Sequence, residues 1–169
     1  LRAAQEARKA GKVRFIGFTG HKSPRIHLKM LAVPFEWDSC QMPINVMDAR
    51  IELFSHEVVP VCQKKNVGVI GMKGCGGDAK MLTSGAVSVE ECYRYFLSQP
   101  VSVQVVGLAS MEHLNGALRM AGVFQPMTKA EMDTLQARIK DVQSDGRFEL
   151  FKTAKNFDAG YHRKQHGSK

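Results

Sequence analysis

The sequence is poor in the features that identify a protein class at first sight. Its four cysteines are dispersed and form no C-x-x-C pair, so a zinc or iron–sulfur site has weak support and buried thiols in a reducing compartment are favoured. No apolar run approaches the ~18 residues that cross a bilayer, and the N-terminus lacks the apolar centre of a secretory signal. These absences favour a soluble, cytoplasmic protein with no membrane partner.

Motifs of the common catalytic classes are also missing. The chain has no G-x-x-x-x-G-K-[ST] loop, no G-x-G-x-x-G after a strand, no H-E-x-x-H and no local signature of a Ser/His/Asp set. No pair of carboxylates has a spacing that implies a glycosidase. The residues alone therefore assign no catalytic role and no metal ligand.

Charge is in excess of one sign, because 24 Lys and Arg against 16 Asp and Glu give a net charge of +8. Such a bias attracts phosphates, whether of nucleic acid, anionic lipid or a nucleotide cofactor. Much of the excess lies near the two ends of the chain, no run of five or six basic residues occurs, and aromatics do not interleave with the charges. This distribution favours a solvated surface and disfavours a nucleic-acid partner.

The 169 residues suffice for one packed domain, with 44% hydrophobic residues, but fall short of the ~250 typical of a closed (β/α)8 barrel. The chain begins with Leu1 and not with Met, so we expect that upstream residues have been lost. Four short apolar runs rich in β-branched residues predict buried strands. The runs are 13–20, 39–46, 67–74 and 101–110.

Segments of helical periodicity separate these strands, and such alternation predicts an α/β protein with parallel strands. Capping signals open helices at Ser23-Pro24, at Ser88 with Glu91 and at Thr128 with Glu131. Pro60 predicts a kink or a late start in a helix over 53–65.

We expect a partial barrel over residues 1–125, followed over 126–169 by a helix and tail. The helix carries Met132, Leu135, Ile139 and Val142. The tail carries aromatics that could pack either on the barrel exterior or over its mouth, namely Phe148, Phe151, Phe157 and Tyr161.

Ligands of parallel α/β folds bind at the carboxyl ends of the strands. Lys73 at one such end is interpreted either as a phosphate or acid–base group or as a solvated lysine on the rim. The glycine cluster from Gly74 to Asp78 is interpreted as a flexible turn or as a phosphate cradle. His21 could stack, donate or titrate, whereas His27 is expected on the surface of the following helix.

Four motifs together resemble the aldo/keto reductase family. Gly11-Lys-Val-Arg-Phe-Ile-Gly-Phe-Thr-Gly-His21 is similar to that family's fifth strand, and Gln41 followed by Asn45 looks like its sixth. Val67-Gly-Val-Ile-Gly-Met-Lys73 is similar to the seventh strand, and Val105-Val-Gly-Leu-Ala-Ser-Met-Glu-His-Leu114 resembles the eighth strand with its helix. The motifs occur in order and with suitable spacing over about residues 1–145.

The resemblance implies the C-terminal half of a (β/α)8 TIM barrel, with four parallel βα units and a C-terminal helical extension. It also implies NADPH, with NADH as the alternative, lying extended across the strand ends. By position, one end of the implied site would face the nicotinamide, the middle would line the pyrophosphate path and the far end would meet the adenosine phosphate. The implied cofactor-binding residues are Thr19, Gly20, His21, Gln41 and Met72 at the first end, Lys73 and Gly74 in the middle, and Gly107, Ser110 and His113 at the far end.

The chain departs from the family's pattern at several positions. Gly20 lacks the amide side chain common there, and Gly116 and Ala117 replace residues that usually hold the adenine. The family's Asp, Tyr, Lys and His tetrad lies on its second to fourth strands, whereas this chain begins in the helix after the fourth. No catalytic residue is therefore assigned.

The favoured hypothesis is the cofactor-binding half of a reductase that transfers hydride from NAD(P)H to an aldehyde or ketone, a small carbonyl substrate. The alternative is a non-catalytic half-barrel with a binding or regulatory role that self-associates. Two open sheet edges invite either the missing N-terminal half or a second copy.

Overall fold

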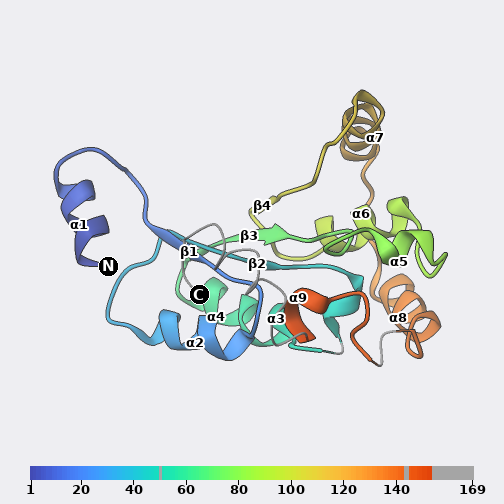
Figure 1. Cartoon of the computed structure of the whole chain (residues 1–169), viewed down its shortest axis with the longest axis horizontal. Helices are drawn as coiled ribbons and strands as arrows, with labels where there is room; N and C mark the ends of the chain where they lie inside the picture. The colour runs from blue at the N-terminus through green and yellow to red at the C-terminus, as the bar shows by residue number, and fades with distance from the viewer. Residues whose placement is uncertain (50, 143–144, 154–169) are drawn as a thin grey trace, which may run out of the picture.

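The computed structural model describes residues 1–49, 51–142 and 145–153 (Figure 1). Four parallel strands form one sheet in the order β1-β2-β3-β4, so each strand pairs with the next one along the chain. The strands are β1 (Gly17–Thr19), β2 (Ser39–Pro43), β3 (Gly68–Met72) and β4 (Val103–Gln104). The predicted α/β class with four parallel units is confirmed.

The two central strands are the longest, and they pair from Ser39 against Gly68 to Pro43 against Met72. Both edge strands are shorter than the sequence predicts. Val13 and Phe15 lie before β1 with 40% and 67% of their surface exposed. An edge strand has one neighbour only, so it gains less from pairing than a central strand and its ends are left unpaired despite their β propensity.

Helices follow each strand, as Figure 1 shows. Before and between the first three strands lie α1 (Arg2–Lys9), α2 (Pro24–Ala32), the 3-10 helix η1 (Val46–Ala49), α3 (Phe54–Glu57) and α4 (Val59–Lys64). After β3 come α5 (Lys80–Thr83), α6 (Val89–Leu97), α7 (Met111–Gly122), α8 (Lys129–Arg138) and α9 (Leu150–Thr153). Across the described residues no helix is long and apolar enough to cross a membrane.

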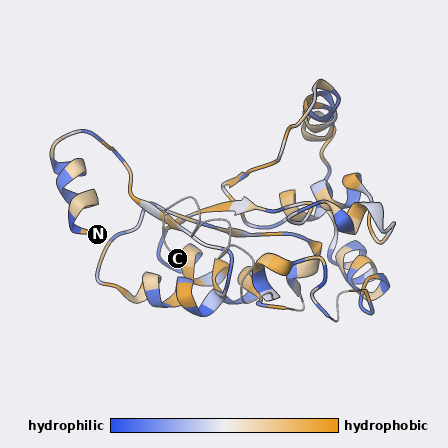
Figure 2. Cartoon of the chain, in the orientation of Figure 1, coloured by the Kyte–Doolittle hydropathy of each residue, from blue (hydrophilic) through white to orange (hydrophobic). Residues whose placement is uncertain are grey.

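The sheet buries one face and leaves the other more open. The row Phe18, Cys40 and Val69 contributes to the hydrophobic core. Figure 2 shows hydrophobic segments along both the strands and the helices that cover them. The next row, on the opposite face because strand side chains alternate, holds exposed Thr19 and half-buried Gln41. In a closed barrel this second face would point to the interior.

Local signals in the sequence determine where several of the helices begin. Ser88 with Glu91 and Thr128 with Glu131 both form reciprocal capping boxes. Pro60 stands in the first turn of α4, after a break from α3 at Val58, as its missing N–H requires. α8 ends at Arg138, so it is shorter than the predicted pattern through Val142.

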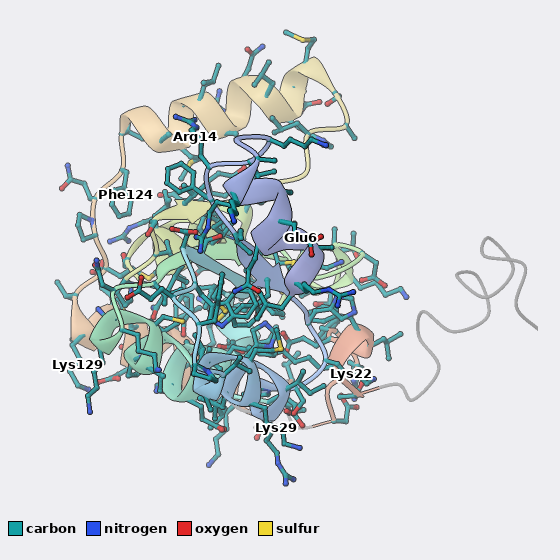
Figure 3. All side chains as sticks on the ribbon, turned by 90° about the vertical axis from the view of Figure 1, so that its left-hand side faces the viewer. Glu6, Arg14, Lys22, Lys29, Phe124 and Lys129 are labelled. Carbon is teal, nitrogen blue, oxygen red and sulfur yellow. The ribbon has the colours of Figure 1, made fainter. Side chains whose placement is uncertain are left out.

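Two helices contact the core through partly buried residues only, Ala4 of α1 and Ala117 and Met120 of α7. Neither α1 nor α7 contains a buried residue. Figures 1 and 3 both show α7 projecting to one side of the sheet, away from α2 and α4. Its exposed apolar residues include Met111 and Leu118, at 67% and 62% exposure.

Candidate functional site

A groove of about 490 Å³ lies at the carboxyl ends of the central strands. The sheet forms it because parallel pairing brings the ends of β2 and β3 and the segment after β4 to one edge. Among the predicted cofactor residues it is lined by Gln41, Met72, Lys73, Gly74 and Gly107. Gln41, the Met72–Gly74 segment and Gly107 are far apart in the sequence, and the fold brings these three segments together.

Lys73 is the one cation among the residues that line this groove. Its backbone is left-handed, at φ +58°, and its carbonyl accepts a hydrogen bond from Asn45 Nδ2 at 3.2 Å. Its ammonium lies 5.4 Å from the centre of the Phe151 ring, a cation–π contact. Lys73 is therefore half-buried and held at the mouth of the groove. This placement is intermediate between the two interpretations from the sequence, a group that meets the ligand and a solvated lysine on the rim.

The glycine-rich loop after Lys73 combines tight packing with an open turn. A Cβ at Gly74 would lie 2.5 Å from the Phe96 ring and 2.8 Å from Gln104 Nε2, so packing against α6 demands glycine there. Gly76 turns the chain at φ +80° and donates its N–H to the Lys73 carbonyl at 2.8 Å. Asp78 pairs with Lys80 at 2.7 Å, and this pairing holds the pKa of Asp78 below its usual value.

The end of β1 lies beside the groove without lining it. Thr19 stands opposite Gln41 in the sheet register, and the Gly20 N–H donates to the Gln41 carbonyl at 3.3 Å. The His21 ring lies 5.7 Å from the Phe151 ring, in an edge-on contact. The Phe151 ring therefore contacts both His21 and Lys73 across the mouth of the site.

Ser110 and His113 lie outside the groove, at the N-terminus of α7. The Ser110 hydroxyl accepts the His113 N–H at 3.2 Å, as a helix N-cap does. His113 Nδ1 accepts the Ala109 N–H at 3.4 Å. Both side chains serve the local geometry of α7, and this structure does not bring them to the other predicted residues.

A buried ion cluster fixes α9 against the strand ends. Lys152 Nζ lies 2.7 Å from Asp48 Oδ1 and 3.0 Å from Glu149 Oε1, and the side chains of Lys152 and Asp48 are both 0% exposed. Asn45 Nδ2 donates to Glu149 at 3.0 Å. Burial raises the pKa of Asp48 and of Glu149, and the Lys152 ammonium opposes that rise. The cluster positions Phe151 over the mouth of the site, whereas Phe148 packs against the hydrophobic core. Phe157 and Tyr161 lie outside the described residues.

His27 was predicted on the surface, and this prediction is wrong. The side chain is 2% exposed, because α2 turns it under the end of β1 against Phe18 and Phe54. Burial holds its pKa below the ordinary 6.5. The sequence signal was the glycine at position 20, which leaves room for the ring.

The groove also includes residues that the sequence did not single out as a site. They are Ala79, Tyr93, Val105 and Val106, and the groove is lined as well by Cys75, Gly76, Gly77 and Asp78 of the glycine cluster that the sequence offered as a possible phosphate cradle. Burial raises the pKa of Tyr93, so its hydroxyl stays protonated at neutral pH. Tyr95 lies in the core, where burial first and the Asp48 carboxylate second raise its pKa to about 12. A tyrosine so held is a poor proton donor for catalysis.

The thiols behave as the sequence predicts: all four cysteines are free, with Cys40, Cys62 and Cys92 buried and Cys75 half-buried. Within the described residues no group of three or more His, Cys, Asp or Glu side chains could hold a metal ion.

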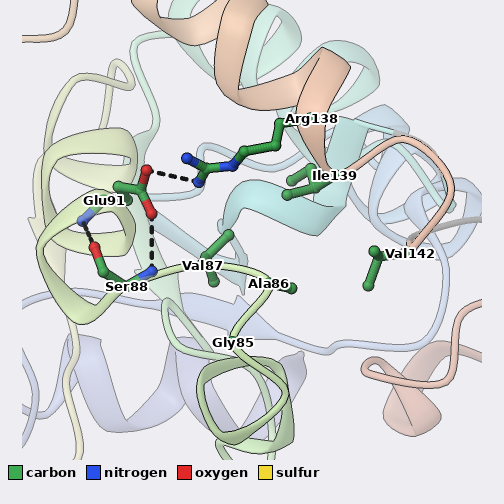
Figure 4. A pocket seen from close by; sticks show the side chains of 8 residues that line it. All are labelled: Gly85, Ala86, Val87, Ser88, Glu91, Arg138, Ile139 and Val142. Atoms are coloured by element: carbon green, nitrogen blue, oxygen red, sulfur yellow. Dashed lines mark hydrogen bonds and ion pairs between the residues drawn. The ribbon is translucent and has the colours of Figure 1, made fainter.

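A second pocket, of about 580 Å³, lies between the start of α6 and the end of α8 (Figure 4). Its charged groups pair with each other, since Arg138 Nη2 lies 2.6 Å from Glu91 Oε1. The other Glu91 oxygen accepts the Ser88 N–H at 2.8 Å. The carboxylate and the guanidinium of this pocket are already paired with each other. The pocket therefore serves the packing of α8 against the start of α6.

Comparison with known proteins supports the fold. The model of the aldo/keto reductase family matches residues 1–83. No curated protein sequence gives a significant match.

Among solved structures, an aldo-keto reductase from Bacillus halodurans in its apo form superposes with a TM-score of 0.59 at 17% identity, over 81% of this chain and 55% of its own. A thermostable aldo-keto reductase, Tm1743, in complex with the inhibitor epalrestat gives 0.57 at 16% identity, over 82% and 53%. One from a Medee basin deep-sea metagenome library gives 0.52 at 13% identity, over 81% and 52%. The chain thus spans about half the length of these barrels.

Proposed function

Because the model of the aldo/keto reductase family matches residues 1–83, we propose that this chain is the cofactor-binding half of such a reductase. The reaction is the transfer of hydride from NADPH, or from NADH as the alternative, to an aldehyde or ketone. The observation that carries the proposal is the groove, where five predicted cofactor residues from separate strand ends meet: Gln41, Met72, Lys73, Gly74 and Gly107.

The groove has the donor set that a dinucleotide needs. The carboxamide of Gln41 lines it and makes no hydrogen bond within the described part of the chain, so its donor and acceptor would face a nicotinamide amide. Lys73 would meet the pyrophosphate as the cation of the groove. A Cβ at Gly107 would contact nothing within 4 Å, so bare backbone is open to the ligand.

A bound cofactor would supply the hydride, and the residues of this chain would hold and orient that cofactor. A proton donor beside the carbonyl oxygen is also needed, and burial raises the pKa of Tyr93, the tyrosine that lines the groove, which weakens it in that role. We therefore expect the chain alone to bind NADPH without oxidising it in the presence of an aldehyde.

The test is a titration of the 169-residue chain with NADPH, in which the fluorescence of the nucleotide reports binding. Replacement Lys73→Met removes the charge at the same backbone position, and we expect the Kd to rise about 10-fold, as the loss of one charge-assisted contact implies. Lys129→Met on α8, where Lys129 is 87% exposed and remote from the groove, is the matched control. An unchanged Kd in Lys73→Met would contradict the proposal.

The open sheet edges support a second candidate function, a non-catalytic half-barrel that associates with another half. Val103 on β4 is 56% exposed, and Phe15 before β1 is 67% exposed. Unpaired edges with apolar neighbours favour strand addition. The partner would be the missing N-terminal half or a second copy. Sedimentation velocity over a concentration series separates them: a mass that rises with concentration supports the second copy, and a constant monomer mass argues against it.

The same proposal places the protein in the cytoplasm. Fractionation of cells that express the whole protein tests this placement.

A further inference from the structure

The ring of His27 fills the space beneath Gly20. A Cβ built at Gly20 would lie 2.8 Å from His27 Cε1, closer than real Cβ atoms come to a neighbour. Gly20 is not among the residues with positive φ, so its backbone conformation does not require glycine. The ring of His27 is therefore the reason that position 20 has no room for a side chain.

His27 also ties the ends of two strands together. Its Nε2 lies 3.1 Å from the Gln41 carbonyl oxygen. Because a carbonyl only accepts, Nε2 carries the proton of the neutral ring. The Gly20 N–H donates to the same oxygen at 3.3 Å. The Gln41 carbonyl therefore joins β1, β2 and α2 at one point.

The imidazole is held rigidly at that point. It is 2% exposed, with its ring centre 5.4 Å from that of Phe18 and 5.0 Å from that of Phe54, edge-on to the latter at 86°. Rings packed on two sides restrict its rotamer, so the Nε2–H keeps its direction. The strand ends that it joins present Thr19 and Gln41, both predicted at the nicotinamide.

We propose that His27 is a positioning residue for the nicotinamide end of the cofactor site, acting through Gly20 and the Gln41 carbonyl. This inference rests on the proposed function and adds a specific determinant to it. The ring takes the volume that a side chain at position 20 needs, so the strand ends are fixed by a histidine from α2. His27 does not touch the cofactor.

The experiment compares NADPH with 2′,5′-ADP, which carries the adenosine end alone, in titrations of the full 169-residue chain. For His27→Ala we expect the Kd of NADPH to rise about 10-fold, while that of 2′,5′-ADP changes less than about 2-fold. His27→Gln keeps a donor near the Nε2 position and is expected to recover affinity to within about 3-fold of the wild type. Equal weakening of both ligands, or no recovery in His27→Gln, would overturn the positioning role.

A double-variant cycle tests the steric part without any ligand. Gly20→Asn introduces the clash, and Gly20→Asn with His27→Ala removes it, so the double variant should unfold at a higher urea concentration than Gly20→Asn alone. Additive losses would overturn the steric part of the inference. If the wild-type chain binds neither nucleotide, the proposed function fails together with the nicotinamide role, and this cycle still decides whether His27 excludes a side chain at position 20.

Discussion

The two ends of the predicted cofactor path differ in how the fold holds them. At the nicotinamide end and in the middle of the path, Gln41, Met72 and Lys73 meet in one groove, against buried residues and a buried ion cluster. At the adenosine end, Ser110 and His113 lie on α7, a helix without a buried residue. All of these residues lie on or after strands of the sheet, yet only the first three come together in one site, and Ser110 and His113 stay apart from it.

Neighbouring structure explains the difference. β2 and β3 are paired on both sides, and the helices cover one face of each. β4 is an edge strand, and α7, which follows it, has no buried residue and meets the core through the partly buried Ala117 and Met120. A helix in a protein gains most of its stability from packing its apolar face. An additional half-barrel at this edge would give α7 its missing contacts.

The largest loss of stability is expected on breaking the buried ion cluster that holds α9 beside the groove. Lys152→Met leaves the Asp48 and Glu149 carboxylates buried without a counter-ion, so we expect a loss of about 3–5 kcal/mol in the free energy of unfolding. Urea denaturation measures it, with Lys129→Met as a control that should change little. A loss as small as that of the control would show that the cluster does not secure the groove.

The next effect compares Gly74, in the middle of the path, with Gly116, in the helix at its adenosine end. Gly74→Ala pushes a Cβ into Phe96 and Gln104 and should destabilise the chain by about 1–3 kcal/mol. Gly116→Ala in α7 meets only Arg119 Nη2, at 4.0 Å, and should cause no loss. Urea denaturation of both variants provides the comparison, and equal losses would contradict the difference in packing.

Hydrogen exchange sharpens the comparison without substitution. Amides of β2 and β3 should exchange at least ~100-fold more slowly than those of α7, because the central strands open only with the core. Mass spectrometry of deuterated peptides measures the ratio. Slow exchange throughout α7 would mean that it has a packing partner in solution, and a dilution series would then show whether that partner is a second copy.

The smallest effect is a pH dependence at the assembled end. Because burial holds the pKa of His27 below 6.5, the unfolded chain binds more protons than the folded chain as the pH falls below about 6.5. The nearby His21, once charged, disfavours protonation further. This part of the stability is present at neutral pH and is lost on acidification. His27→Gln should flatten the fall in Tm between pH 7.5 and 5.5, and an unchanged slope would assign the pH dependence to other groups.

Local signals in the sequence predicted local structure well. The capping boxes at Ser88 and Thr128 form, and Pro60 divides α3 from α4. The prediction for His27 failed because its depth depends on a glycine seven residues earlier and on Phe54 from another helix. The Lys152 cluster was also missed, since its partner Asp48 lies 104 residues away and no spacing rule connects them.

The sequence by itself determined the order of strands and helices, the parallel sheet and the strand ends that carry the site, because these follow from periodicity, caps and turns along a continuous chain. Only the tertiary structure decided which of the predicted residues meet. It brought Gln41, Met72 and Lys73 to one groove and left Ser110 and His113 on α7. Burial, pairing and steric exclusion act between segments far apart in the sequence, and they are fixed only when those segments pack together.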